Sequence, residues 1–231
     1  MDNTVFPQPS SAVADRFGIY PTDFIVESIL DEKLKWFRST PKAEHDVFGR
    51  LLMPQIAKRY GEAKIAEIAK YIRDTDIRII QAFPAEDAQM PMISINLGDS
   101  AEAEQYSGLN RFAGHVDNLG PTGNVVGRQE VGYIPIQDSI LIGIHASGTP
   151  DKVKYLYQFV AYSLASSISQ FEAMGFFSVT QRATDMSRFN EYLPANIFTR
   201  FMTLTLTTMP RFKKDVVPMV DSIVVNVGVP D

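Results

Sequence analysis

The three histidines are the side chains best suited to catalysis or metal binding in this 231-residue sequence. His45, His115 and His145 lie far apart, and none has a second ligand at metal-binding spacing. His145 follows the apolar run of "SILIGIHA" (139–146), where a strand end could display a general base. A general base needs a positioned acid or nucleophile, and the sequence shows no acid partner. We therefore predict that His145 is structural or lies in an interface.

Two polar loops could bind a ligand, but neither has the required spacing. Asp99, Glu102 and Glu104 do not match the alternating ligands of a calcium loop, so a solvated acidic loop is expected. The glycines between residues 98 and 132 form no G-x-G-x-x-G, and no G-K-[ST] follows them. The sequence therefore predicts no metal and no cofactor.

Serines and arginines give no nucleophile or basic cluster. Four serines fall within a helical pattern instead of a G-x-S-x-G turn, which favours close packing: Ser163, Ser166, Ser167 and Ser169. Five arginines are scattered near predicted loops: Arg111, Arg128, Arg182, Arg188 and Arg200. Solvated positions or ion pairs between subunits are expected for them. We predict no catalytic residue and a protein that is not an enzyme.

Composition narrows the possible classes of protein further. The chain has no cysteine, which excludes disulfides and thiolate chemistry and fits assembly in a reducing cytoplasm. A net charge of −5 gives no general attraction to nucleic acid or anionic membrane. No apolar run approaches the roughly 18 residues of a membrane span. Residues 1–20 are expected to form a flexible arm without a targeting signal.

The first third of the chain predicts helices. A helix is expected from Thr22, as N-cap, to about residue 38, with Phe24, Ile25, Ile29 and Leu34 in its apolar stripe. Residues 44–74 then read as two shorter helices, interrupted around Pro54 and Gly61.

The remainder predicts strands around one long helix. Short β-branched runs at 76–84 and 91–98 precede a long glycine-bearing loop at 98–132, with a short hairpin near 120–133. A strand then ends at His145. Thr149 as N-cap and Pro150 at the first position start a helix of about 25 residues that ends at Gly175. Further strands are expected at 176–183 and 196–208, with a last one after Pro218.

These elements predict an α+β fold: a mostly antiparallel sheet of about four to six strands against a long central helix, with N-terminal helices added. We expect a single domain over 21–231, with a helical elaboration at about 44–74. The order of the elements resembles the tail terminator and neck proteins of long-tailed bacteriophages. The resemblance is carried by "MPMISINLG", "GIHASGTPDKVKYLYQFVAYSL", "MGF" and "YLPANIFTRFMTLTL", and covers 76–208 best. The helices at 44–74, the long loop and the strand after Pro218 exceed the usual family core.

The resemblance implies a structural virion protein of the head–tail junction. It implies a ring, usually a homo-hexamer, that caps the tail tube and docks it to the head connector. The implied partners are copies of the chain, the tube protein, a sheath protein in some tails, and the head-completion protein. The genome would pass through the ring without specific recognition. Assembly in the host cytoplasm is implied, with the neck of the virion as the final location. Five residues are predicted to lie in interfaces: Arg111, Phe112, Arg128, His145 and Arg188.

Two alternatives remain at this point. One is another neck, sheath-associated or contractile-injection-machine component. The other is a small-molecule enzyme or binding module that uses His145 and the glycine-rich loop.

Overall fold

The computed structural model describes residues 21–58, 61–84, 88–103, 112–119, 125–184 and 196–215. The helices are α1 (Thr22–Ser39), α2 (Ala43–Phe48), the 3-10 helix η1 (Gly49–Leu52), α3 (Pro54–Ala57), α4 (Gly61–Asp74), α5 (Pro150–Ala165) and α6 (Ile168–Ala173). The strands are β1 (Arg78–Ile80), β2 (Met92–Glu102), β3 (Phe112–Leu119), β4 (Val125–Tyr133), β5 (Ile136–Ser147), β6 (Phe176–Thr184), β7 (Ile197–Thr208) and β8 (Arg211–Asp215).

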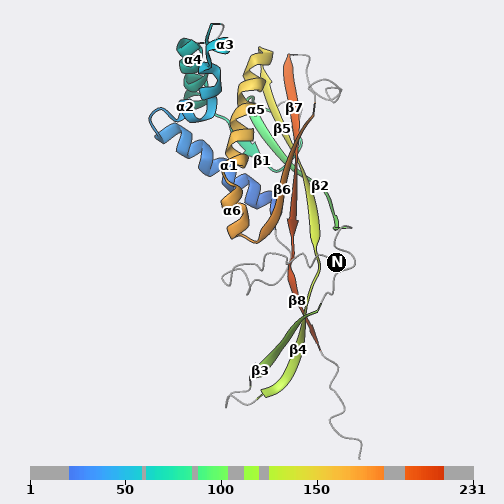
Figure 1. Cartoon of the computed structure of the whole chain (residues 1–231). Coiled ribbons are helices and arrows are strands. Elements are labelled where there is room, and N and C mark those ends of the chain that lie inside the picture. The colour runs from blue at the N-terminus through green and yellow to red at the C-terminus, as the bar shows by residue number, and fades with distance from the viewer. Residues whose placement is uncertain are drawn as a thin grey trace, which may run out of the picture.

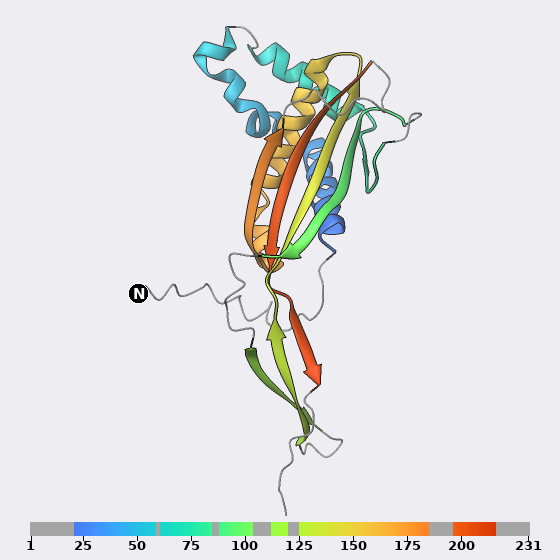
Figure 2. The ribbon, with the colours of Figure 1, turned by 90° about the vertical axis from the view of Figure 1, so that its right-hand side faces the viewer.

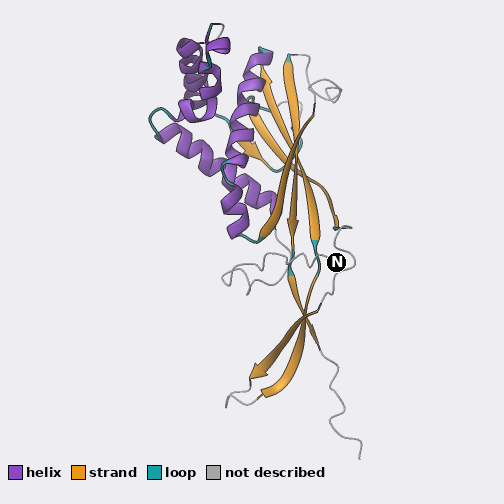
Figure 3. Cartoon of the chain, in the orientation of Figure 1, coloured by secondary structure: helices purple, strands orange, loops and turns teal. Residues whose placement is uncertain are grey.

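The main sheet has five strands in the order β1-β2-β5-β7-β6. Only β1 and β2 run parallel, and the other neighbours are antiparallel. The helices lie on one side of this sheet, with α5 along it (Figures 1 and 3). The predicted α+β class, with a mostly antiparallel sheet against a central helix, is confirmed.

The core lies between the sheet and the helices because the central strands alternate as predicted. In β5, Ile140, Ile142 and Ile144 are fully buried, next to Ile93 of β2 and Leu204 of β7 on the same face. From the helical side, the cluster receives mainly aromatic and aliphatic side chains, among them Val26, Leu30, Phe37, Leu156, Phe159 and Phe171. Figure 2 shows the opposite face of the sheet turned to the viewer, with the helices behind it.

The helices at 43–74 share this core. Val47, Phe48 and Ile65 belong to the same hydrophobic cluster as Phe159 of α5. Four helical segments occupy the place of the two predicted helices: α2 runs into η1, the chain turns at Met53 before α3, and α4 begins at Gly61, which has a φ of +46°. The apolar face predicted for the second of them is buried in α4: Ile65, Ile68, Ala69 and Ile72.

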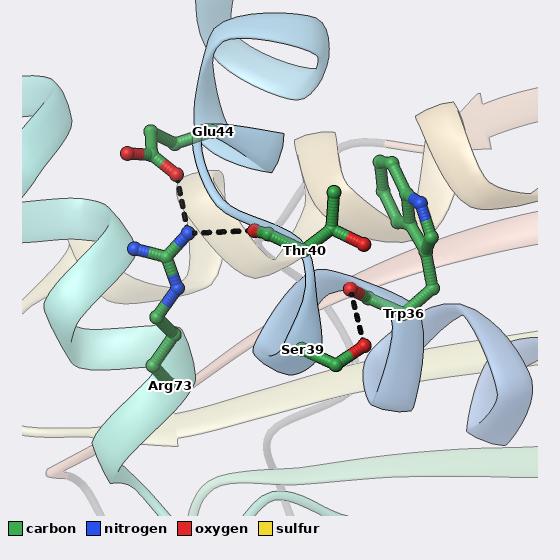
Figure 4. A network of polar contacts seen from close by, with 5 residues as sticks. All are labelled: Trp36, Ser39, Thr40, Glu44 and Arg73. Carbon is green, nitrogen blue, oxygen red and sulfur yellow. Dashed lines mark hydrogen bonds and ion pairs between the residues drawn. The ribbon is translucent and has the colours of Figure 1, made fainter.

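A polar network joins the turn after α1 to α2 and α4 (Figure 4). Arg73 Nη2 lies 2.5 Å from Glu44 Oε2 and donates to the carbonyl oxygen of Thr40 at 3.3 Å. The same guanidinium lies 5.4 Å from the ring centroid of Phe37. Ser39 Oγ donates to the carbonyl of Trp36 at 3.2 Å, inside the last turn of α1. One cation thus links three helical segments.

The long central helix is interrupted, which corrects the prediction of one helix of about 25 residues. Thr149 is at the N-cap position and Pro150 follows, as expected, but α5 ends at Ala165 and α6 starts at Ile168. Ser163 Oγ donates to the carbonyl of Phe159, and Ser166 Oγ donates to that of Ser163. Such back-bonding serines compete with the helical ladder and bend it. Gly175 ends α6 with a φ of +99°, as predicted.

The stretch predicted as a long loop at 98–132 contains regular strands. β2 continues to Glu102, with a bulge between Leu97 and Asp99, and β3 and β4 form a hairpin. β8 pairs with β4 and completes a second sheet of order β3-β4-β8. Strand β8 was missed because "RFKKD" has no apolar alternation. The arm at 1–20, most of the loop after β6 and the strand predicted after Pro218 lie outside the described residues.

The second sheet continues from the first. Ile136 pairs with Thr208 at the end of the β5–β7 ladder, and Tyr133 pairs with Arg211 at the start of the β4–β8 ladder in the same register. Pro135 and Pro210 interrupt the strands between them, because proline has no N–H for a ladder hydrogen bond. The result is a long two-stranded ribbon that carries β3 beyond the end of the main sheet (Figure 1).

Candidate functional site

His145 lies at the centre of a buried polar bridge across three strands. Its Nε2 lies 2.9 Å from Ser94 Oγ on β2, and its Nδ1 lies 3.0 Å from Thr199 Oγ1 on β7. The ladders set these contacts, because Thr199 pairs directly with His145 and Ser94 pairs with Gly143, two residues before it. All three side chains are at most 2% exposed.

Gly143 makes room for the imidazole. A Cβ built on Gly143 would lie 2.5 Å from Ser94 Oγ and 2.6 Å from His145 Nε2, both shorter than any tolerated contact. The imidazole therefore lies across the bare backbone of the residue two positions earlier on the same face. Phe201 packs against it edge-on, with ring centroids 6.1 Å apart. Glycine at 143 is a requirement of the bridge.

Burial keeps His145 neutral. Desolvation lowers the pKa of His145 from 6.5 to about 4. A neutral imidazole has one donor and one acceptor, and each flanking hydroxyl can supply the opposite role. Either tautomer therefore satisfies both ring nitrogens. The bridge is a set of neutral hydrogen bonds that links the three strands.

The Ser94–His145 pair has the spacing of a nucleophile and its base, about 2.6–3.2 Å. Two features argue against catalysis. The third partner is the hydroxyl of Thr199, where a carboxylate would stabilise an imidazolium. Ser94 is 0% exposed, so its hydroxyl is not accessible to a substrate in this structure. We interpret the group as a structural bridge.

Sequence reasoning placed Ser94 and Thr199 on strand faces but did not bring them to His145. They lie 51 and 54 residues away along the chain. The signal available in the sequence was Gly143, a glycine inside a strand, which often marks the close approach of another group.

The other predicted interface residues fall in or near the second sheet. Phe112 is the first residue of β3, and Arg128 lies in β4 opposite Asp117 of β3. Arg111 and Arg188 lie outside the described residues. The structure therefore places Phe112 and Arg128 in the β3–β4 hairpin and places His145 in the interior of the main sheet. That these residues meet a neighbouring subunit stays a prediction.

The described part of β3-β4-β8 has no helical layer over it in Figure 1. Near the proline junction, Val131 is buried, and Tyr133 and Phe212 are half-buried. A small sheet is stable when a hydrophobic face packs on something. This projecting sheet, defined by Phe112–Leu119, Val125–Tyr133 and Arg211–Asp215, is our first candidate assembly surface.

Arg200 is the arginine with the most distinctive surroundings. Its guanidinium lies 3.8 Å from the ring centroid of Tyr157 on α5, on the helical side of the sheet. Its Nε is buried without a hydrogen-bond partner in the described structure. This contact ties β7 to α5 and is not a solvated position.

No group of three or more potential metal ligands occurs in the part of the chain that the structure describes. Across the same described residues, no helix is long and apolar enough to cross a membrane.

Comparison with known proteins gives little. No protein-family model and no curated protein matches the sequence. Among solved structures, the chain is similar to the sheath/tube terminator of PVC, an extracellular contractile injection system, determined by cryo-EM in the extended state. The sequence identity is 15% and the TM-score is 0.36. The alignment covers 74% of this chain and 65% of that one, so it spans less than two thirds of the neighbour. A TM-score this low carries no argument, and the proposals below rest on the residues of this chain.

Proposed function

We propose that this protein is a structural subunit of a phage or phage-derived tail. It forms a ring that caps the tail tube and docks it to the head connector. Subunits of a tail or neck act by binding one another through complementary surfaces. A buried, neutral His145 bridge and the absence of a metal-ligand group among the described residues fit that role.

The projecting sheet is the observation that carries the proposal. Three strands extend beyond the end of the main sheet on a ribbon of β5 and β7, and none of the described helices covers them (Figure 1). A sheet of this size gains stability by packing against another surface. In a ring, the projecting sheets of all subunits would emerge at the same end and form one docking surface.

The part of the main sheet's outer face beyond the buried His145 bridge fits the wall of a channel. By strand register, half-buried hydroxyl side chains lie on this face, among them Thr203 and Thr205 of β7 and Ser139 of β5. Neutral polar side chains can line a channel without holding a passing polyanion. The genome would pass such a wall without specific recognition.

Assembly tests the proposal directly. We expect the purified chain, alone or with its tail-tube protein, to form rings by light scattering and negative-stain electron microscopy. Added to growing tubes, the rings should stop elongation and shorten the tubes. A chain that stays monomeric with and without tube protein, and leaves tube length unchanged, contradicts the proposal.

A charge reversal separates docking from ring formation. Arg128→Glu, in the projecting sheet, is expected to leave rings intact and weaken tube capping. The matched control is Glu172→Lys on the exposed side of α6, which should change neither. Equal capping by both variants would exclude the part of the projecting sheet around Arg128 as the docking surface.

A further inference from the structure

The main sheet has two free edges on opposite sides. β1 covers only Met92–Ser94 of β2, so the outer side of β2 from Ile95 to Ala101 pairs with no strand among the described residues. β6 is the last strand on the other side and, among the described strands, pairs with β7 alone. Figure 2 shows these two strands along the left and right borders of the sheet.

The two edges are complementary in direction. Each step from β2 through β5 and β7 to β6 is antiparallel, so β6 runs opposite to β2. When a second copy is placed beside the first by rotation about an axis along the strands, its β2 lies antiparallel to the first copy's β6. Antiparallel pairing is the more stable of the two arrangements per residue.

The two edges are also level with each other. Leu97 pairs with Ile140, which pairs with Leu204, which pairs with Gln181. Through the same ladders, Asp99 is level with Thr180. The free part of β2 and the strand β6 therefore meet along their lengths without sliding along the axis.

Their charges are of opposite sign. Asp99 is exposed on the β2 edge, and Arg182 is exposed on the β6 edge. In the level register they are diagonal neighbours on one face, roughly 7–8 Å apart and within reach of an arginine side chain. Pairing β2 with β2 of another copy would instead bring Asp99 near its own equivalent, which disfavours that wrong pairing.

We propose that the β2 edge of one copy (Ile95–Ala101) pairs antiparallel with the β6 edge (Ser178–Ala183) of the next copy, joining the five-stranded sheets into one continuous sheet. The interface is head-to-tail, the type that closes into a ring. This inference rests on the proposed function, because it supplies the contact between ring subunits.

Disulfide cross-linking tests the pairing without interference from native thiols, because the chain has no cysteine. Leu97→Cys is combined in one chain with Val179→Cys, Gln181→Cys or Ala183→Cys, which all face the same side as Leu97. Two strands separate β2 from β6, so the sites lie about 14 Å apart within one chain. That exceeds the roughly 7 Å limit for a disulfide, so only bonds between copies can form. The control partner is Glu62→Cys, exposed on α4, which packs against the other N-terminal helices and not against β6.

We expect Leu97→Cys with Gln181→Cys to give a ladder of covalent oligomers up to the ring size, and the control pair to give none above the single variants. A second pair, Asp99→Cys with Thr180→Cys, guards against unfavourable geometry, because successive antiparallel pairs alternate between close and wide spacing. Suppose that rings form but neither pair gives cross-links, and that Leu97→Cys gives none with Val179→Cys or Ala183→Cys either. This result would overturn the edge pairing and leave the proposed function standing. Neither rings nor cross-links would overturn both.

Charge exchange gives an independent result. Arg182→Glu should raise the protein concentration needed for half-assembly several-fold, and Asp99→Arg in the same chain should restore it. Failure of the second substitution to restore assembly contradicts the proposed register.

Discussion

Replacing Gly143 by alanine tests the buried His145 bridge, because the structure predicts whether the substitution raises or lowers the free energy of unfolding. An alanine in a strand is normally more stable than glycine by about 0.5–1 kcal/mol. Here the new Cβ would lie 2.5 Å from Ser94 Oγ and 2.6 Å from His145 Nε2. Ordinary contacts are about 3.5–4.0 Å, so the imidazole must move by about an ångström.

That movement breaks the hydrogen bonds of 2.9 and 3.0 Å that His145 makes. Each buried polar group left without a partner costs about 1–3 kcal/mol. After the intrinsic gain of alanine is subtracted, we expect Gly143→Ala to lower the free energy of unfolding by about 2–4 kcal/mol. In a His145→Ala background the obstructing His145 Nε2 is gone, and the loss of stability caused by Gly143→Ala should fall to about 1 kcal/mol or less.

Urea unfolding followed by the fluorescence of Trp36, the single tryptophan, measures these differences. The control is Gly49→Ala, where a Cβ meets nothing within 4 Å and φ is −56°. That variant should be unchanged or more stable by up to about 1 kcal/mol. A neutral or stabilising Gly143→Ala, or an equal cost in both backgrounds, would refute the reasoning.

Three further predictions concern the protonation of His145, the Arg73 network and the Arg200–Tyr157 contact. Because burial holds the pKa of His145 near 4 against 6.5 when unfolded, the unfolded state binds more protons between these values. The free energy of unfolding should be highest above pH 6.5 and fall by about 3 kcal/mol toward pH 4. This fall should be absent in His145→Gln. Urea midpoints at several pH values measure both. Arg73→Ala should cost about 1–3 kcal/mol by urea unfolding, because it leaves a half-buried carboxylate and a carbonyl without their donor. Lys35→Ala, in an exposed ion pair, should leave the urea midpoint nearly unchanged, and a loss equal to that of Arg73→Ala would contradict the reasoning. Tyr157→Leu should cost about 1–2 kcal/mol in the same assay, since it removes the ring under Arg200, and no loss would mean that the stacked cation contributes nothing.

Local signals in the sequence determined much of the secondary structure. The alternation of Ile140, Ile142 and Ile144 with Gly143 and His145 predicted both faces of β5. Proline after Thr149 predicted the start of α5, and Gly175 predicted the end of α6. These signals act within a few residues, because strand and helix periodicity and backbone restrictions are properties of short segments. The α+β class followed from their order.

The break between α5 and α6 was not predicted, although its cause is also local. The apolar period continues through Leu164, Ile168 and Phe171, while the serine hydroxyls take the carbonyls of the helix. A hydrophobic pattern reports which side faces the core and does not report how the backbone hydrogen bonds are shared. Strand β8 was also not predicted, because its pairing with β4 is set by the ribbon that leads into it.

Only the tertiary structure decided what His145 does. The sequence indicated a structural or interface residue, but its partners lie on strands more than 50 residues away on each side. Register alone brings Ser94 and Thr199 to the two ring nitrogens, and a slip of one residue would send them to the other face. The two level, antiparallel edges of β2 and β6 are likewise invisible in the sequence, because they arise from the strand order of the folded sheet. The sequence by itself determined which segments form strands and which sides face the core, and long-range pairing decided which polar groups meet and which edges remain free.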